Sequence, residues 1–261
     1  MAEPPPRLES SAIADDLTED KWLGGRLALL QPRRGHRVGT DAALLAAATG
    51  ARQGRIVDVG AGVGAVGLAL AKRSESVSVD LVEIDPGLAA LAERNAALNG
   101  LQARARVLRL DALVLKERRE ARLAEADCIV TNPPFFDAAR VRASSDIARA
   151  RAHILGEAGL ADWIEASLAM LAPGGRFVMI HRPEALSVIL AALENRLGAT
   201  ALLPVHPHAG ANAHRLLVAG VKGSKAPLSI APGLILHGSD GRLTAEADAL
   251  HRGERLIDWG G

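Results

Sequence analysis

The stretch that decides the fold is Arg55-Ile56-Val57-Asp58-Val59-Gly60-Ala61-Gly62-Val63-Gly64. A short apolar run leads into three glycines at alternate positions, and a helical pattern follows over residues 66–73. This order predicts a buried strand, a glycine turn and the N-terminus of a helix. Glycine lets the backbone approach a ligand closely, and the helix adds free N–H groups and its positive end. We therefore expect the turn to bind a ligand.

Strands and helices alternate on both sides of this stretch. We expect strands over residues 77–83, 105–110, 128–130, 176–180, 200–205 and 215–221, and helices over residues 66–73, 85–98, 112–123, 160–171 and 183–197. Such alternation indicates an α/β fold with a mainly parallel sheet covered by helices on both faces. Residues 23–39 predict a small hairpin, and Thr40 and Asp41 are expected to cap a helix over residues 42–49. Residues 228–237 predict a terminal hairpin.

The chain divides into three expected segments: a mobile tail (1–22), a single domain that includes the hairpin and first helix (23–225), and a C-terminal hairpin extension (226–261). A content of 49% hydrophobic residues is ample for one core. The single cysteine, Cys128, lies in an apolar run, which excludes a disulfide framework and favours a reducing compartment. No apolar stretch approaches the about 20 residues of a spanning helix, and the acidic, proline-rich N-terminus is unlike a signal peptide. We expect a cytoplasmic protein.

The charge pattern bears on possible partners. A formal net charge of +1 argues against a strong, global affinity for nucleic acid. Arginine dominates the basic residues, and its planar fork suits phosphate, although coding bias explains the excess equally well. Five residues of one later segment either meet phosphates or form a solvated helix face. They are Arg140, Arg142, Arg149, Arg151 and His153. His206, His208 and His214 lack partners at metal-ligand spacing, so no metal site is expected.

A second stretch, Thr131-Asn132-Pro133-Pro134-Phe135-Phe136, follows the apolar run that contains the cysteine. An exocyclic amine or an amide is a poor nucleophile because its lone pair is delocalised. The Asn132 side-chain carbonyl and the Pro133 carbonyl can each accept one N–H and so favour a pyramidal nitrogen. The two prolines stiffen the turn, and Phe135 offers an apolar face on which a base can stack. Taken alone, the pattern is equally compatible with an ordinary turn.

The glycine turn by itself leaves a nicotinamide enzyme open. Gly60, Gly62 and Ala65 satisfy the pattern G-x-G-x-x-A, and Glu83 lies near the expected position of a ribose-binding carboxylate. Two features favour a cationic ligand instead. Asp58 carries a negative charge just before the first glycine, and hydride transfer has no use for the Asn-Pro-Pro-Phe turn.

Together these motifs resemble those of the class I S-adenosylmethionine-dependent amino-methyltransferases. The resemblance rests on residues 57–64, Val82-Glu83-Ile84-Asp85, Asp111 and Asn132-Pro133-Pro134-Phe135, and it covers residues 24–223. It implies a Rossmann-like class I methyltransferase fold with a seven-stranded, mostly parallel sheet. Residues 37–45 also resemble the corresponding segment of the bacterial tRNA(Val) adenine-N6 methyltransferases, which modify the base beside the anticodon.

The resemblance implies a role for each motif residue. The cofactor S-adenosylmethionine, which becomes S-adenosylhomocysteine, would bind at the glycine turn near Asp58, with its ribose on Glu83 and its adenine beside Asp111. The full cofactor set is Asp58, Gly60, Ala61, Gly62, Gly64, Glu83, Ile84, Asp111, Ala112 and Asn132. The catalytic turn is Asn132, Pro133, Pro134 and Phe135, in which Asn132 and the Pro133 carbonyl would hold the acceptor amine. Further substrate candidates are Phe136, Thr40, Asp41, Arg140 and Arg142.

The expected reaction is methyl transfer to the N6 amine of an adenine in tRNA, with the base flipped out of its stack. Ribosomal-RNA guanine-N2 and protein glutamine N5 methyltransferases share such a turn, and a small-molecule amine is another possible acceptor. A catalytically silent RNA-binding module is the alternative outside enzymes, against which the intact Asp58, Glu83 and Asn132 argue. No metal, membrane or obligate protein partner is expected.

Overall fold

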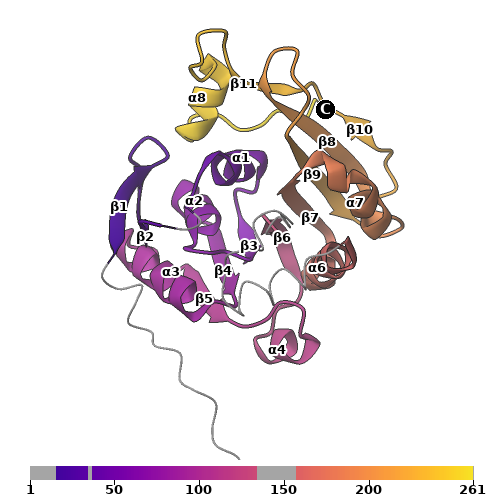
Figure 1. Ribbon diagram of the computed structural model, residues 1–261. Coiled ribbons are helices and arrows are strands. Elements are labelled where there is room, and N and C mark those ends of the chain that lie inside the picture. Colours follow the sequence, from indigo (N-terminus) through magenta and orange to yellow (C-terminus); the bar gives the residue numbers. More distant parts are fainter. Residues whose placement is uncertain (1–15, 35–36, 134–156, 261) are drawn as a thin grey trace, which may run out of the picture.

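The computed structural model describes residues 16–34, 37–133 and 157–260 (Figure 1). Its centre is one sheet with the core strand order β5-β4-β3-β6-β7-β9-β8. Within the described residues the seven core strands are β3 (Gly54–Val59), β4 (Val77–Glu83), β5 (Ala105–Arg109), β6 (Ala126–Thr131), β7 (Leu171–His181), β8 (Leu197–His208) and β9 (Arg215–Lys222). Neighbours are parallel except that β9 is antiparallel to both β7 and β8. The mostly parallel sheet expected from the sequence is confirmed.

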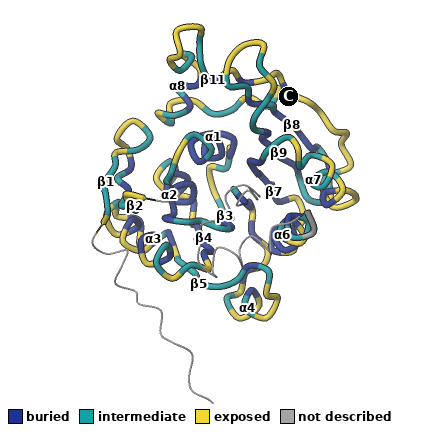
Figure 2. Tube along the Cα trace, viewed as in Figure 1, coloured by how far each residue is buried: buried dark blue, intermediate teal, exposed yellow. Residues whose placement is uncertain are grey.

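Helices cover both faces of the sheet because successive strand residues point to opposite sides. Ile56 of β3 belongs to one buried cluster, while its neighbour Val57 belongs to another. The first cluster includes residues of α1 (Thr40–Ala48), α2 (Ala65–Arg73) and α3 (Pro86–Leu98), and the second includes residues of α6 (Glu157–Met170) and α7 (Leu186–Leu193). The 3-10 helix η2 (Pro183–Ala185) precedes α7. Figure 2 shows the central strands as largely buried between these layers.

The N-terminal hairpin lies earlier in the chain than expected. β1 (Leu17–Trp22) pairs antiparallel with β2 (Leu27–Pro32), so both the placement at residues 23–39 and the tail boundary at residue 22 are wrong. The sequence of β1, Leu-Thr-Glu-Asp-Lys-Trp, is mostly polar and lacks the alternation of apolar and polar residues that predicts a strand. The strand forms through backbone pairing with β2. β2 carries the buried side chains, since Leu27 and Leu29 are both fully enclosed.

Helix α1 starts differently from the sequence expectation. Its N-cap is Gly39 and no side chain caps it, so the capping role expected for Thr40 and Asp41 is wrong. Both residues make tertiary contacts instead. The Asp41 carboxylate accepts from Nε of Arg215 at 2.9 Å, and the Thr40 hydroxyl lies 3.2 Å from Nε2 of His251. Residues 42–48 are all buried, so the surroundings fix this helix more than its local caps do.

The C-terminal segment is not the expected hairpin. β10 (Ser229–Ile230) and β11 (Leu234–His237) both pair in parallel with β8 and not with each other. Residues 231–233, which include Pro232-Gly233, therefore connect two short strands that both pair with β8. The sequence also missed α8 (Ala245–His251), whose N-cap Thr244 accepts from the Ala247 N–H at 3.1 Å. None of the described helices is long and apolar enough to cross a membrane.

Candidate active site

The two motif turns meet at the centre of the sheet, where the strand order reverses. β3 and β6 are parallel neighbours, and Val59 pairs with Thr131 in register. Gly60 and Asn132 are the next residues of these strands, so both turns begin side by side at the carboxyl edge of the sheet. Open α/β sheets bind their ligands at such a switch point. The structure thus brings Asn132 next to the glycine turn, as expected.

The glycine turn has the backbone that its sequence requires. Gly60, Gly62 and Gly64 have φ angles of 74°, 58° and 85°, in a region that residues with side chains rarely adopt. The N–H groups of Gly60 and Ala61 both donate to the Val82 carbonyl at 2.9 Å. A Cβ atom at Gly62 would have no atom of the described residues within 4 Å. The turn is therefore held by β4 and open to a ligand at Gly62.

Glu83, at the end of β4, organises the turns on both sides of it. One carboxylate oxygen accepts from the Gly62 N–H at 2.9 Å, and the other accepts from the Asp85 N–H at 2.8 Å. The residue is only 6% exposed. Carboxylate oxygens are acceptors for hydroxyl groups such as those of a ribose. Binding of ribose by Glu83 stays a prediction that this geometry accommodates.

Asp58, near the end of β3, connects this strand to α2. Its carboxylate accepts from the Gly67 N–H at 2.8 Å and is 2% exposed. Burial raises the pKa of this carboxyl to about 7, with a smaller contribution from the charge of Glu83, while the Gly67 hydrogen bond opposes the shift. The expected attraction of a cation by Asp58 therefore depends on pH.

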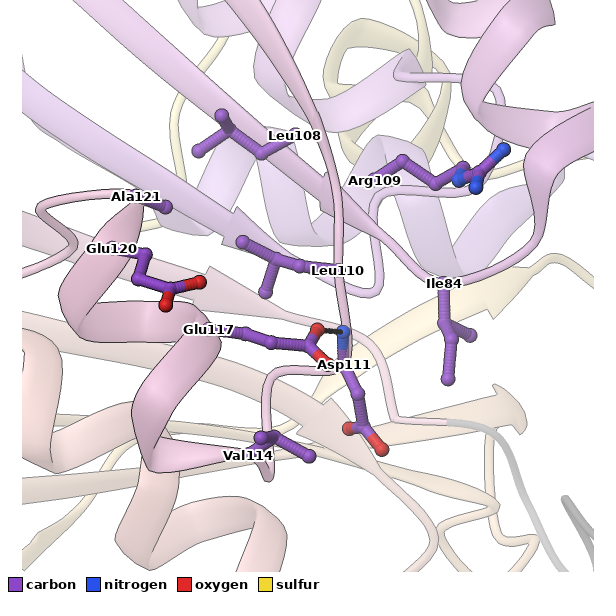
Figure 3. Close-up of a pocket in the computed structure, with 9 residues that line it drawn as sticks. All are labelled: Ile84, Leu108, Arg109, Leu110, Asp111, Val114, Glu117, Glu120 and Ala121. Carbon is purple, nitrogen blue, oxygen red and sulfur yellow. Dashed lines mark hydrogen bonds between the residues drawn. The ribbon is translucent and has the colours of Figure 1, made fainter.

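A cavity of about 690 Å³ opens at the ends of β4 and β5 (Figure 3). Ile84 is 49% exposed and Val114 39% exposed, so both leave apolar surface open in it. The Asp111 carboxylate and the Ile84 side chain point the same way in Figure 3. The full lining is Ile84, Leu108, Arg109, Leu110, Asp111, Val114, Glu117, Glu120 and Ala121. Ile84, Leu108, Leu110, Val114 and Ala121 supply the apolar part of this lining, and Asp111, Glu117 and Glu120 supply carboxylates. Apolar side chains beside a carboxylate suit a planar heterocycle that carries an amine, as the adenine of S-adenosylmethionine does.

The turn after β5 holds Asp111 in place. Its Oδ1 atom accepts from the Leu113 N–H at 2.8 Å, and its own N–H donates to the Glu117 carboxylate at 2.7 Å. This turn delays the helix, so α4 (Leu115–Glu120) is shorter than the helix expected over residues 112–123. Ala112 is 6% exposed and packs in the core instead of lining the cavity. Sequence reasoning missed the role of Glu117.

Asn132 carries an unsatisfied acceptor. Its Oδ1 atom is buried and has no hydrogen-bond partner among the described residues. An unpaired buried acceptor costs about 1–3 kcal/mol, which a ligand N–H at this position would recover. Pro133, the next residue, is itself buried. The acceptor that the sequence assigned to an amine is therefore in place and unused by the described protein.

Sequence reasoning missed Trp163, which also reaches this site. Its indole Nε1 comes from α6 and donates to the Thr131 hydroxyl at 2.9 Å. The helical spacing of residues 160–171 predicts only a helix, so no local signal marks this tryptophan. Trp163 reaches the site because β3 and β6 are neighbours in the sheet.

The remaining predicted site residues divide into two groups. Thr40 and Asp41 lie in the first turn of α1 and are held by His251 and Arg215. The predictions for several others lie outside the described residues. These are Pro134, Phe135, Phe136, Arg140, Arg142, Arg149, Arg151 and His153. Within residues 16–34, 37–133 and 157–260, no cluster of three or more histidine, cysteine or acidic side chains could hold a metal ion.

Comparison with known proteins places this geometry in a family. The family model described as "Methyltransferase small domain" matches residues 36–202. A tRNA1(Val) (adenine(37)-N6)-methyltransferase of Tolumonas auensis is 32% identical over 152 residues, which are 58% of this chain and 61% of that protein. The protein of the same name in Aeromonas hydrophila is 32% identical over 188 residues, which are 70% of this chain and 75% of that protein.

Solved structures give the same answer for the fold. A predicted O-methyltransferase of Agrobacterium tumefaciens has a TM-score of 0.70 and 32% identity, and the match covers 83% of this chain and 98% of that one. The Thermus thermophilus 16S rRNA N2 G1207 methyltransferase, solved with AdoMet and guanosine, has a TM-score of 0.54 and 23% identity, over 79% of this chain and 50% of that one. By the match over residues 36–202 and these relatives, the chain belongs to the methyltransferase small-domain family.

Proposed function

We propose that this S-adenosylmethionine-dependent methyltransferase methylates the N6 amine of an adenine in tRNA, as the names of its relatives indicate for adenine-37 of tRNA1(Val). The observation that carries the proposal is the buried Oδ1 atom of Asn132, which lies beside the glycine turn and has no hydrogen-bond partner within the described residues. An amide oxygen in that position is suited to accept an N–H from the substrate.

The donor half of the site binds and orients the cofactor, which supplies an electrophilic methyl group on a sulfonium. Gly62 allows close approach of the backbone because its Cβ position is open. Glu83 would accept from the ribose hydroxyls, and the cavity lined by Ile84 and Asp111 would hold the adenine. Asp58, near the end of β3, contributes negative charge whenever it is ionised.

The acceptor half makes the amine nucleophilic by position alone. Asn132 Oδ1 and the Pro133 carbonyl each accept one N–H, which turns the nitrogen lone pair toward the glycine turn. No strong general base is required, because the nitrogen becomes more acidic as its new bond forms. The target adenine would be flipped out of the RNA stack to reach this pocket.

Two rivals are weighed against this proposal. The ribosomal guanine-N2 enzyme among the structural neighbours is 23% identical, so it supports the fold and not the substrate. The Agrobacterium protein is described as an O-methyltransferase, and an amide oxygen also accepts from a hydroxyl. The relatives of 32% identity named as tRNA adenine-N6 enzymes favour the amine. We place this activity in the cytoplasm.

The test uses radiolabelled S-adenosylmethionine and unmodified transcripts of tRNA1(Val), with nucleoside analysis of the product. N6-methyladenosine should form on the wild-type transcript and not on one in which adenine-37 is replaced by guanine. Asn132→Ala should lower kcat by about 100-fold or more while the affinity for S-adenosylhomocysteine stays within about threefold. Formation of N2-methylguanosine or of a ribose 2′-O-methyl group instead would overturn the proposal.

A further inference from the structure

Trp163 joins the two halves of the site through one buried hydroxyl. Its indole Nε1 donates to Thr131 Oγ1 at 2.9 Å, and Thr131 Oγ1 in turn donates to the Val59 carbonyl at 2.8 Å. Thr131 is completely buried. The chain of hydrogen bonds therefore runs from α6 to the last residue of β6 and on to the last residue of β3. Asn132 and Gly60 are the residues that follow those two strand ends.

The ring of Trp163 also contacts the glycine turn itself. A Cβ atom placed on Gly60 would lie 3.0 Å from Cζ2 and 3.2 Å from Cη2 of the indole, which is tighter than ordinary contact. Gly60 also has a φ angle of 74°, which residues with a side chain rarely adopt. A substitution at Gly60 is therefore unfavourable both for the backbone angle and for the contact with the indole. The indole edge thus limits where the first residue of the turn can lie.

We infer that Trp163 is a positioning residue, which fixes the separation between the glycine turn and the Asn132 amide. The inference rests on the proposed function, because this separation is the one that the methyl group crosses. Tryptophan combines a large rigid ring with one N–H donor. The ring sets the position of Gly60 while the donor holds the Thr131 hydroxyl. Phenylalanine would retain part of the ring contact and lose the hydrogen bond.

The first test is Trp163→Phe, with Trp259→Phe as a matched control. Trp259 also donates from its indole Nε1, at 3.2 Å to the Ala48 carbonyl, but it packs with the other buried cluster. Trp163→Phe should lower kcat by about 10- to 100-fold and leave the affinity for S-adenosylhomocysteine within about threefold. Trp259→Phe should leave kcat unchanged. An unchanged kcat in Trp163→Phe, or an equal loss in both variants, would overturn the inference.

A second variant guards against a folding defect. Thr131→Val removes the same hydrogen bond from its other end and keeps a β-branched side chain of similar shape. The double variant combines Trp163→Phe with Thr131→Val. If Trp163 acts through the Thr131 hydroxyl, the fold-loss of kcat in the double variant should be smaller than the product of the two single fold-losses. All rates are measured well below each variant's Tm. Fully multiplicative losses would show that Trp163 and Thr131 act separately, against the inference.

A third measurement does not require any acceptor. Trp22→Phe combined with Trp259→Phe leaves Trp163 as the only tryptophan, because the chain has three. Saturation with S-adenosylhomocysteine should shift or quench its fluorescence if the indole borders the donor turn. Calorimetric binding without any fluorescence change would overturn the inference. A second outcome separates this inference from the proposed function. If the fluorescence of Trp163 changed on cofactor binding but the wild type methylated no tRNA, the proposed substrate would be wrong, whereas the position of Trp163 beside the donor turn would be supported.

Discussion

At the scale of single residues, Asp58 and Asn132 are two polar side chains at the ends of central strands that differ in their hydrogen bonding. The Asp58 carboxylate is bound by the Gly67 N–H at 2.8 Å, so it serves the architecture of the turn as well as its charge. Asn132 Oδ1 has no partner in the described part of the chain. A satisfied group can stabilise the free protein, whereas an unsatisfied one is stabilised when a ligand arrives.

Asp58 should make cofactor affinity depend on pH. Burial raises the pKa of its carboxyl to about 7, so the side chain is neutral below that pH and anionic above it. Only the anion attracts a sulfonium. Between pH 6 and pH 8 the affinity for S-adenosylmethionine should rise by about three- to tenfold more than that for S-adenosylhomocysteine, which carries no sulfonium charge. Calorimetric titration with both compounds at each pH measures this ratio.

The control is Asp58→Asn, in which the ratio of the two affinities should no longer change with pH. The same substitution tests the sign of the effect on stability. Because the folded pKa is raised from 3.8 to about 7, folding takes up a proton and Asp58 destabilises the fold progressively as pH rises through that range. The variant should lose this part of the pH dependence in denaturant titrations. A ratio equal at both pH values in the wild type would show that Asp58 has no electrostatic role.

At the scale of elements, α3 connects the N-terminal hairpin to the glycine turn. Asn95 is fully buried, and its amide exchanges hydrogen bonds of 2.7 and 3.0 Å with the backbone of Leu30 in β2. The same amide donates to the Val63 carbonyl at 2.9 Å. Asn99, one helical turn later, makes equivalent bonds of 3.0 and 2.7 Å to Ala28 but does not reach the glycine turn. Asn95 of α3 and its C-cap residue Asn99 thus both bind the hairpin, and Asn95 also binds the glycine turn.

This arrangement predicts different outcomes for Asn95→Ala and Asn99→Ala. Both should lower the free energy of unfolding, by about 2–4 kcal/mol for the fully buried Asn95 and by less for Asn99. Only Asn95→Ala should also weaken S-adenosylhomocysteine binding, by about threefold or more, since it alone releases Val63. Denaturant titration and calorimetry on both variants check the pair. Equal effects on binding would mean that the turn does not depend on α3 through this contact.

At the scale of the whole molecule, α1 is the helix on which distant segments converge. Its first turn meets β9 and α8 through Asp41 and Thr40. The carbonyls of its last turn, which no helix can satisfy internally, are bound by groups far away in the chain. The Arg73 guanidinium donates to the carbonyls of Ala46 and Thr49. The Ile257 N–H donates to the Ala47 carbonyl at 3.0 Å, and the Trp259 indole N–H donates to the Ala48 carbonyl at 3.2 Å. This helix is therefore completed by the C-terminal residues.

Ending the chain at Arg255 should expose this dependence. The deletion leaves the carbonyls of Ala47 and Ala48 without their partners and removes the packing of Trp259. The free energy of unfolding should fall by about 2–4 kcal/mol, which corresponds to a fall of about 5–10 °C in Tm for a domain of this size. Affinity for S-adenosylhomocysteine should stay within about twofold, because none of the deleted residues lines the described cavity. An unchanged Tm in scanning calorimetry would show that water replaces these bonds at no cost.

The sequence by itself determined the features that depend on local pattern. Strand and helix periodicity gave the α/β fold, three glycines gave the turn with positive φ, and the Asp85-Pro86 pair gave the start of α3 with its side-chain cap. Motifs at the ends of successive strands predicted a set of residues that lies along one edge of the sheet, because parallel strands bring their carboxyl ends to the same edge. These features follow from backbone conformation and from residues a few positions apart.

Only the tertiary structure decided which distant groups meet. β1 is polar and becomes a strand through its pairing with β2, and α1 needs partners up to 211 residues away to complete its ends. Trp163 has no signal of its own until β6 is seen beside β3. The physical reason is the same in each case: a hydrogen bond between remote residues depends on the order of strands in the sheet, which no short stretch of sequence encodes.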